Sequence, residues 1–354
     1  MQFASDNRAG ICPEVLDAIV EEAAHDGGGY GEDIATRQLT AAFAELFEHD
    51  VWVYPVLTGT AANSLALATL CDPWGGVICS RAAHILEDEC GAPEFFGGGL
   101  RLVPVGDGSG RIVPSQVASL IDTAGEHDVH NTPLQVLSFT NLSERGISWS
   151  PDATAELAGV AAGRGLSVHL DGARFANAVV GTGASPADLT WRAGVDVLSF
   201  GGTKNGALAA EAVVFFAPEH GAELERRRKR GGQLFSKMRF VSVQLLAQVR
   251  GDAWLRHASH ANAMATRLAV GLGVSPPDGN ELFVPATTPE VAAWRAAGAD
   301  FYDSPAGPDR LVRLVTSWST TPEEVDAFAA VARPGDAADA GRAAVPAAER
   351  AEKS

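Results

Sequence analysis

Apolar residues recur along the chain with two different periods. Val15, Leu16 and Ile19 fall on one side of a helix expected to begin at Pro13, where proline is favoured, and residues 39, 43 and 46 repeat the helical spacing. Short apolar runs predict strands at residues 51–57, 77–79, 101–105, 134–139, 166–170, 195–200 and 212–216. Helices are expected between them at 64–70 and 151–163, the second capped by Ser150. This alternation indicates parallel crossover units, so we expect an α/β fold in which helices cover both faces of a mainly parallel sheet.

The pattern changes after residue 240. Long helices are expected at 241–250 and 253–271, and strands at 281–284 and 311–317. These spans predict a large α/β domain over residues 1–240 and a smaller α+β domain over residues 241–333. Residues 334–354 are rich in Ala, Asp, Glu and Arg, and such a segment buries too little apolar surface to offset its ordering entropy, so a disordered tail is expected there.

Composition narrows the class of protein. The 354 residues are 46% hydrophobic, which excludes a disordered chain, and the net charge of −17 disfavours nucleic acid and anionic membranes as partners. The N-terminus lacks the pattern of a signal peptide, and the longest apolar run, residues 207–217, is too short to span a membrane. The four cysteines have no CxxC spacing and are expected to be buried, reduced thiols. The sequence therefore predicts a cytoplasmic protein that acts on a small molecule.

Polar residues follow three of the predicted strands. Asp171 comes directly after one strand, Lys204 lies just past the next, and residues 58–60 follow the first. Because ligands in such sheets bind outside the carboxyl ends of the strands, these residues are expected to face one crevice.

Lys204 is the candidate nucleophile. It lies in Gly-Gly-Thr-Lys-Asn-Gly, and a buried lysine at a strand end can attack an aldehyde, whereas an ordinary lysine is a solvated surface charge. Asp171 is suited to hold a pyridinium N–H, and Arg174 has the geometry to bind an amino-acid carboxylate. The alternative for these two is a purely structural Asp–Arg pair.

Other residues are weaker candidates. Residues 58–63, Thr-Gly-Thr-Ala-Ala-Asn, form a strand-to-helix turn that could bind phosphate, although such turns also cap many helices. His84 is either a site residue or a structural histidine, and the basic run at residues 226–230 is either a solvated helix face or a phosphate or subunit contact. Because HExxH, a cysteine cluster and a Walker loop are all absent, no metal site is predicted, and residues 106–110 are expected to be a turn.

Together these motifs resemble the threonine aldolase and β-eliminating lyase family of pyridoxal 5'-phosphate (PLP) enzymes, in particular the low-specificity L-threonine aldolases. The resemblance extends to about residue 330 and is carried, in the family's order, by residues 3–7, 30–33, 58–63, 83–84, 88–93, 169–176, 200–206 and 313–318. It implies the aspartate-aminotransferase-like fold, PLP fold type I, with a seven-stranded type of sheet.

The resemblance also implies roles for individual residues. Lys204 would form the imine with PLP, Asp171 would hold the ring nitrogen, and His84 would stack on the ring and act on the β-hydroxyl. The remaining roles are phosphate binding by Gly59, Thr60 and, more weakly, Thr203; binding of the substrate carboxylate by Ser5, Arg174 and Arg313; and contact with a neighbouring subunit's site by Tyr30 and by Arg230 or a neighbour. The expected assembly is a homotetramer, a dimer of dimers with shared active sites.

The implied reaction is retro-aldol cleavage of L-threonine or L-allo-threonine to glycine and acetaldehyde. Residues 138–146 depart from the family's pattern beside the cofactor, which leaves the β-substituent open. A related lyase or transaldolase that prefers a bulkier substrate such as phenylserine is the first alternative. A cofactor-binding regulator without turnover is the second, and it is disfavoured because no basic helix-turn-helix segment precedes the fold.

Overall fold

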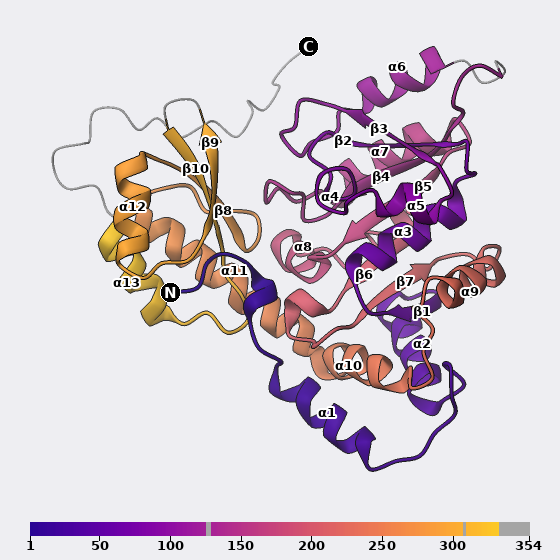
Figure 1. The fold of residues 1–354 in the computed structure, drawn as a ribbon, viewed down its shortest axis with the longest axis horizontal. Helices are drawn as coiled ribbons and strands as arrows, with labels where there is room; N and C mark the ends of the chain where they lie inside the picture. The colour runs from indigo at the N-terminus through magenta and orange to yellow at the C-terminus, as the bar shows by residue number, and fades with distance from the viewer. Residues whose placement is uncertain (125–128, 307–308, 333–354) are drawn as a thin grey trace.

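A seven-stranded sheet in the order β1-β7-β6-β5-β4-β2-β3 forms the centre of the larger part of the molecule (Figure 1). The computed structural model describes residues 1–124, 129–306 and 309–332, so the predicted tail at 334–354 lies outside the described residues. The strands are β1 (Trp52–Val56), β2 (Gly76–Ser80), β3 (Arg101–Val105), β4 (Leu134–Thr140), β5 (Ser167–Gly172), β6 (Val197–Gly201) and β7 (Glu211–Phe215). Each lies within two residues of its predicted bounds.

Strand direction is mixed at one edge of this sheet. β3, β2, β4, β5 and β6 are mutually parallel, whereas β7 pairs antiparallel with both β6 and β1. Only the short turn after β6 separates β6 from β7, and a connection that short can only reverse the chain. The expected α/β class with a mainly parallel seven-stranded sheet is therefore confirmed.

Helices cover both faces of the sheet, and their starts follow from local sequence. Pro13 and Pro151 occupy the first turn of their helices, and the Ser150 side chain accepts a hydrogen bond from Ala153 N, as predicted. The expected start of a helix at Ser64 is wrong, because the Thr58 side chain caps Ala61 N and the helix begins at Gly59. The helices of the larger part are α1 (Pro13–Ala23), α2 (Ile34–Phe47), α3 (Gly59–Leu70), α4 (His84–Glu87), α5 (Ala92–Phe96), α6 (Pro114–Ala124), α7 (Pro151–Ala162), α8 (Phe175–Thr182), α9 (Gly221–Arg230) and α10 (Arg239–Val249).

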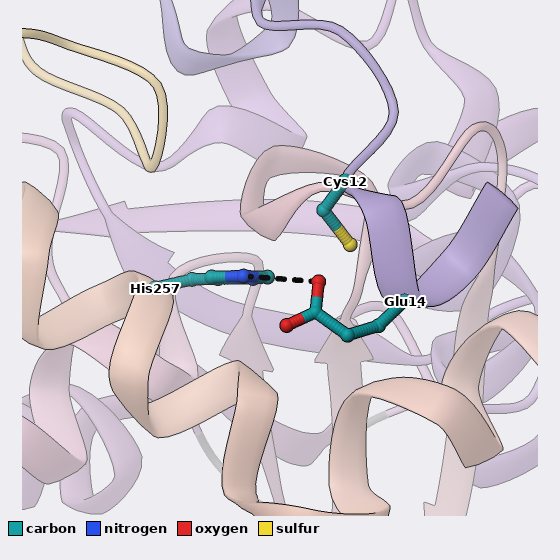
Figure 2. Close-up of side chains that lie close together, drawn as sticks. All are labelled: Cys12, Glu14 and His257. Atoms are coloured by element: carbon teal, nitrogen blue, oxygen red, sulfur yellow. Dashed lines mark ion pairs between the residues drawn. The ribbon is translucent and has the colours of Figure 1, made fainter. Parts of the chain in front are cut away.

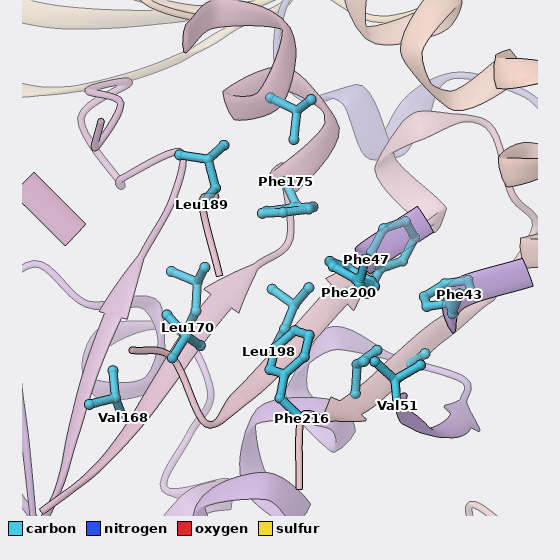
Figure 3. Packing of buried hydrophobic residues seen from close by; sticks show 14 of the residues in the cluster. Phe43, Phe47, Val51, Val168, Leu170, Phe175, Leu189, Leu198, Phe200 and Phe216 are labelled. Atoms are coloured by element: carbon cyan, nitrogen blue, oxygen red, sulfur yellow. The ribbon is translucent and has the colours of Figure 1, made fainter. Parts of the chain in front are cut away.

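Phenylalanine rings pack among Val and Leu side chains in the main core, which includes residues of the sheet and of α2 (Figure 3). The rings of Phe43 and Phe200 meet edge to face with centroids 4.9 Å apart, and Phe47 packs against Phe175 and Phe216. Edge-to-face pairs of this kind stabilise by about 0.5–1.5 kcal/mol beyond the burial of their area. This core includes side chains of β5 and β6, so it anchors the strand that carries Asp171 and the strand that leads into the turn of Lys204.

The smaller unit is a three-stranded antiparallel sheet with helices against it. It comprises α11 (Ala253–Leu272), β8 (Glu281–Ala286), α12 (Thr288–Ala296), β9 (Tyr302–Ala306), β10 (Asp309–Val315) and α13 (Pro322–Ala332), with strand order β8-β10-β9. Phe3, near the N-terminus, belongs to the core of this smaller unit. Helix α10, which precedes the unit in the chain, packs on α1 and α2. The domain boundary at residue 240 stays a prediction.

Cysteine burial differs from expectation at one position. All four thiols are free, and Cys12, Cys71 and Cys79 are buried as predicted, but Cys90 is exposed because it follows the short helix α4 at the surface. Within the described residues, no helix has the length and apolar character needed to cross a membrane.

Candidate active site

Asp171 and Lys204 lie at the carboxyl ends of the neighbouring strands β5 and β6. Asp171 is 4% exposed, and its carboxylate accepts hydrogen bonds from Ala173 N (3.0 Å) and Asn63 Nδ2 (2.8 Å). These donors hold the carboxylate in one orientation and leave it lone pairs for a further donor. Asp171 is therefore built to accept from a ligand at the sheet edge.

Buried side chains from two elements, α10 and β7, shape the turn that carries half-buried Lys204, the short 3-10 helix η3 (Thr203–Asn205). Gln248 Nε2 donates to the carbonyl oxygens of Gly202 (2.9 Å) and Asn205 (3.1 Å). Gly202 N in turn donates to Glu211, whose burial raises its pKa to about 7. The sequence did not predict these supports, because Gln248 and Glu211 are single polar residues within apolar segments.

Asn63 links Asp171 to a second carboxylate. Its Nδ2 donates to Glu89 Oε1 (3.0 Å) as well as to Asp171, and Glu89 Oε1 also lies 2.9 Å from His84 Nδ1. Because a carboxylate only accepts, His84 donates through Nδ1 and its Nε2 is the atom left to take or give a proton. The hydrogen bond to Glu89 raises the pKa of His84, with smaller contributions from the charges of Asp171 and Glu89. This arrangement makes His84 a stronger base.

The segment that departs from the family pattern holds the backbone of His84. Glu144 Oε1 accepts from His84 N (3.1 Å) and from Thr140 Oγ1 (2.5 Å), and burial raises the pKa of Glu144. The loop at residues 138–146 therefore contacts the histidine directly. A change of sequence in this loop changes how His84 is placed.

The start of α3 is open to a small anion. Nothing lies within 4 Å of the position that a Cβ on Gly59 would occupy, and Thr58 caps the helix. The free N–H groups of the first turn and the helix dipole favour an anion there. The side-chain oxygen of Thr203, the weaker candidate, accepts from Ala210 N (3.2 Å).

Arg174 is not free in this structure. It forms two hydrogen bonds to Asp6 (2.7 and 2.9 Å), and its Nη1 lies 3.3 Å from Glu281 Oε2. Glu281 also lies 3.7 Å from Arg313 Nε, so one buried carboxylate stands between the two arginines expected to bind the substrate. The structural alternative, a pair with Asp171, is not what forms, since Arg174 donates its hydrogen bonds to Asp6 and forms an ion pair with Glu281.

A cavity of about 430 Å³ opens beside these groups, and His84, Glu144, Arg174, Glu281 and Arg313 are among its lining residues. Ser5 lies next to Asp6 in the chain and shares a hydrogen bond of 3.4 Å with it. The structure thus brings His84, Arg174 and Arg313 to one cavity, with Ser5 beside the buried Asp6–Arg174 pair.

Tyr30 and the basic run lie elsewhere on this chain. Tyr30 is 53% exposed, and Lys229 Nζ lies 4.3 Å from its ring centroid. Arg230 is exposed at the end of α9, whereas Arg228 is buried against Glu225, so the run is not simply a solvated face. Among the described residues these groups do not line the cavity, and their roles toward a neighbouring subunit stay predictions.

The residues present fit PLP. A carboxylate with spare lone pairs lies at the end of one strand, a lysine at the end of the next, and an open helix start at a third. Two buried oxygens of the polar chain, Asn63 Oδ1 and Glu89 Oε2, have no hydrogen-bond partner within the described residues, which is typical of a site that awaits a polar ligand.

Sequence reasoning missed Asp6, Asn63, Glu89, Glu144 and Glu281 as functional residues. A signal was available for Asn63, because it is the one amide residue in helix α3, whose other side chains are apolar or small hydroxyls and which is buried along most of its length. Asp6 and Glu281 carry no comparable signal, because their partners lie far away in sequence, whereas Glu89 lies only five residues from His84 and Glu144 four residues from Thr140.

Comparisons with known proteins agree with this geometry. Residues 2–278 match the model of the β-eliminating lyase family. The chain is 41% identical over 331 residues to the low specificity L-threonine aldolase of Pseudomonas aeruginosa, covering 92% of this chain and 94% of that protein.

Solved structures show the same fold. The threonine aldolase of Leishmania major superposes with a TM-score of 0.85 at 25% identity, covering 94% of this chain and 98% of that one. A structure of SPT with PLP has a TM-score of 0.71 at 15% identity, covering 94% and 86%, and shows the fold alone.

Proposed function

Because the chain belongs to the β-eliminating lyase family, we propose that it is a PLP-dependent aldehyde-lyase that cleaves L-threonine or L-allo-threonine to glycine and acetaldehyde. The observation that carries the proposal is the polar chain from Asp171 through Asn63 and Glu89 to His84, which ends beside the turn of Lys204. PLP, when bound, supplies an aldehyde for a lysine amine and a ring that accepts an electron pair.

The chain's own residues supply the rest of the chemistry. With PLP bound, Lys204 would be the amine and Asp171 would accept a hydrogen bond from the ring nitrogen. The first turn of α3 at Gly59 and Thr60, and more weakly Thr203, would hold the phosphate. His84 takes the proton of the substrate's β-hydroxyl at Nε2, because Glu89 occupies Nδ1.

Arg174 and Arg313, with Ser5, orient the substrate carboxylate at the cavity of about 430 Å³. Two guanidinium groups that grip one carboxylate fix the direction of the Cα–Cβ bond, and orientation of this kind lowers the barrier to cleavage.

The homotetramer with shared sites, the contacts of Tyr30 and Arg230 with a neighbouring subunit, and the cytoplasmic location belong to the same proposal. Light scattering on the purified protein tests the assembly.

The experiment is to incubate the PLP-loaded protein with L-threonine, L-allo-threonine and L-threo-phenylserine and to quantify glycine and aldehyde. We expect equal amounts of both from threonine, and neither product nor the visible absorbance of the lysine-bound cofactor from Lys204→Ala. Faster cleavage of phenylserine would favour the bulkier β-hydroxy substrate, the alternative left open by the 138–146 loop. Full activity of Lys204→Ala would contradict the assignment.

A further inference from the structure

A second cluster of ligand-type side chains lies against the turn that carries Lys204. Cys12, Glu14 and His257 each present one sulfur, oxygen or nitrogen atom, and these three atoms lie within 4.8 Å of one another (Figure 2). Cys12 and Glu14 come from the start of α1, and His257 comes from the second turn of α11. Three different ligand types thus meet from two helices that are far apart in sequence.

The hydrogen bonding of His257 leaves one ring nitrogen aimed into the cluster. Its Nδ1 lies 3.3 Å from the Asn205 carbonyl oxygen, which can only accept, so Nδ1 carries the hydrogen. Nε2 lies 3.5 Å from Glu14 Oε2, which is longer than an ordinary hydrogen bond. That Oε2 is buried without a hydrogen-bond partner among the residues described. A nitrogen lone pair and a carboxylate oxygen therefore face one another beside a thiol.

We propose that Cys12 Sγ, Glu14 Oε2 and His257 Nε2 bind one zinc ion, with water as the fourth ligand. Zinc accepts sulfur, nitrogen and oxygen ligands, and its bond lengths of about 2.0–2.3 Å give tetrahedral edges of about 3.3–3.8 Å. The separation of 3.5 Å between Nε2 and Oε2 matches such an edge.

Charge and access are consistent with this ion. Binding displaces the thiol proton of Cys12 to solvent, and the resulting thiolate together with the Glu14 carboxylate balances the two positive charges. The Glu14 side chain is 36% exposed, so the cluster lies near the protein surface. Arg256, which also pairs with Glu14, contacts the other carboxylate oxygen and is itself 57% exposed.

The second shell connects the site to the catalytic turn. The Nδ1–H of His257 donates to Asn205 O, the kind of outer contact that orients a metal-bound histidine. Cys12 N donates to Gly206 O (2.9 Å) on the same turn. Zinc would therefore join α1, α11 and the turn of Lys204, and its expected effect is on stability.

The test is to treat the holoenzyme with a chelator, dialyse it, titrate it with zinc chloride and measure bound zinc by mass spectrometry together with the melting temperature. We expect one zinc per chain and a higher Tm. Cys12→Ser and His257→Gln should each weaken zinc binding by at least about tenfold, since even loss of an outer-shell partner costs about 10–100-fold. Cys90→Ser, which removes an exposed thiol, is the matched control and should bind zinc normally.

Two results would overturn the proposal: no stoichiometric zinc on the wild-type protein, or equal zinc binding by wild type and His257→Gln. If Cys12→Ser fails to fold, cobalt replaces the variant as the probe. A cobalt difference spectrum of the wild-type holoenzyme must then show thiolate-to-cobalt absorption that Cys90→Ser retains, and its absence would refute Cys12 as a ligand. Because these readouts do not depend on turnover, their failure is distinguishable from failure of the proposed aldolase activity.

Discussion

Neutralising Glu281 should strengthen binding of the amino-acid substrate. The Glu281 side chain is 1% exposed and pairs with both Arg174 and Arg313, while Asp6 occupies the other edge of Arg174. Two carboxylates thus already balance the two arginines before any substrate arrives. A substrate carboxylate that binds these arginines adds a third negative charge, and Glu281→Gln removes one at nearly constant shape.

The magnitude follows from Coulomb's law. A carboxylate on the same guanidinium groups lies about 6 Å from that of Glu281, and at an effective dielectric constant of about 20 the two repel by about 2.8 kcal/mol. Arg313 is 33% exposed, so water screens part of this energy. If half of this repulsion remains, about 1.4 kcal/mol, the KM of Glu281→Gln for L-threonine should be about tenfold lower than that of the wild type, with kcat changed little.

The assay is steady-state cleavage of L-threonine, with acetaldehyde reduced by a coupled dehydrogenase, supported by calorimetry of glycine binding. The matched control is Glu22→Gln, which neutralises a carboxylate that is 19% exposed and pairs with Arg239 outside this cavity. Both variants should lose unfolding free energy, because each takes a negative charge away from partly buried arginines. An unchanged or raised KM for Glu281→Gln, with kcat retained, would refute the charge argument.

The residues that support the site lead to three further expectations. Burial raises the pKa of Glu211 to about 7. Between about pH 4.5 and pH 7 the folded protein therefore keeps a proton on Glu211 that the unfolded chain releases, and the stability that this proton contributes is lost as the pH rises through 7. Glu211→Gln should remove a decline of about 3 kcal/mol between pH 4.5 and 8 in urea unfolding, and parallel pH curves for the two proteins would contradict this. Asn63→Leu removes the hydrogen-bond donor that Asp171 and Glu89 share, so it should lower kcat at least about tenfold and weaken cofactor binding. Cofactor binding is measured by the visible absorbance that remains after dialysis. Wild-type values of both quantities would show that this hydrogen-bonded link is not needed. Trp254 is fully buried against Phe175 and Phe200, so Trp254→Ala should lower the free energy of unfolding by about 3–5 kcal/mol and Trp254→Phe by less. Equal losses for the two variants in thermal unfolding would rule out a cavity as the cause.

The sequence by itself determined the local elements and the principal chemistry. Hydrophobic period is a property of neighbouring residues, so β5 and β6 could be predicted with the polar residues Asp171 and Lys204 after them. Parallel strands end at one edge of a sheet, which was enough to bring these two residues together.

Only the tertiary structure decided what those residues touch. Asp6 lies 168 residues from Arg174 and Asn63 lies 108 residues from Asp171, yet each pair is hydrogen-bonded. The occupation of Arg174 by Asp6 and Glu281 follows from how the small unit packs against the larger one, and no local pattern encodes it. The same holds for His257 beside Glu14, because an ion pair or ligand cluster depends on distance in space, whereas sequence periodicity reports only which side of its own helix or strand a residue occupies.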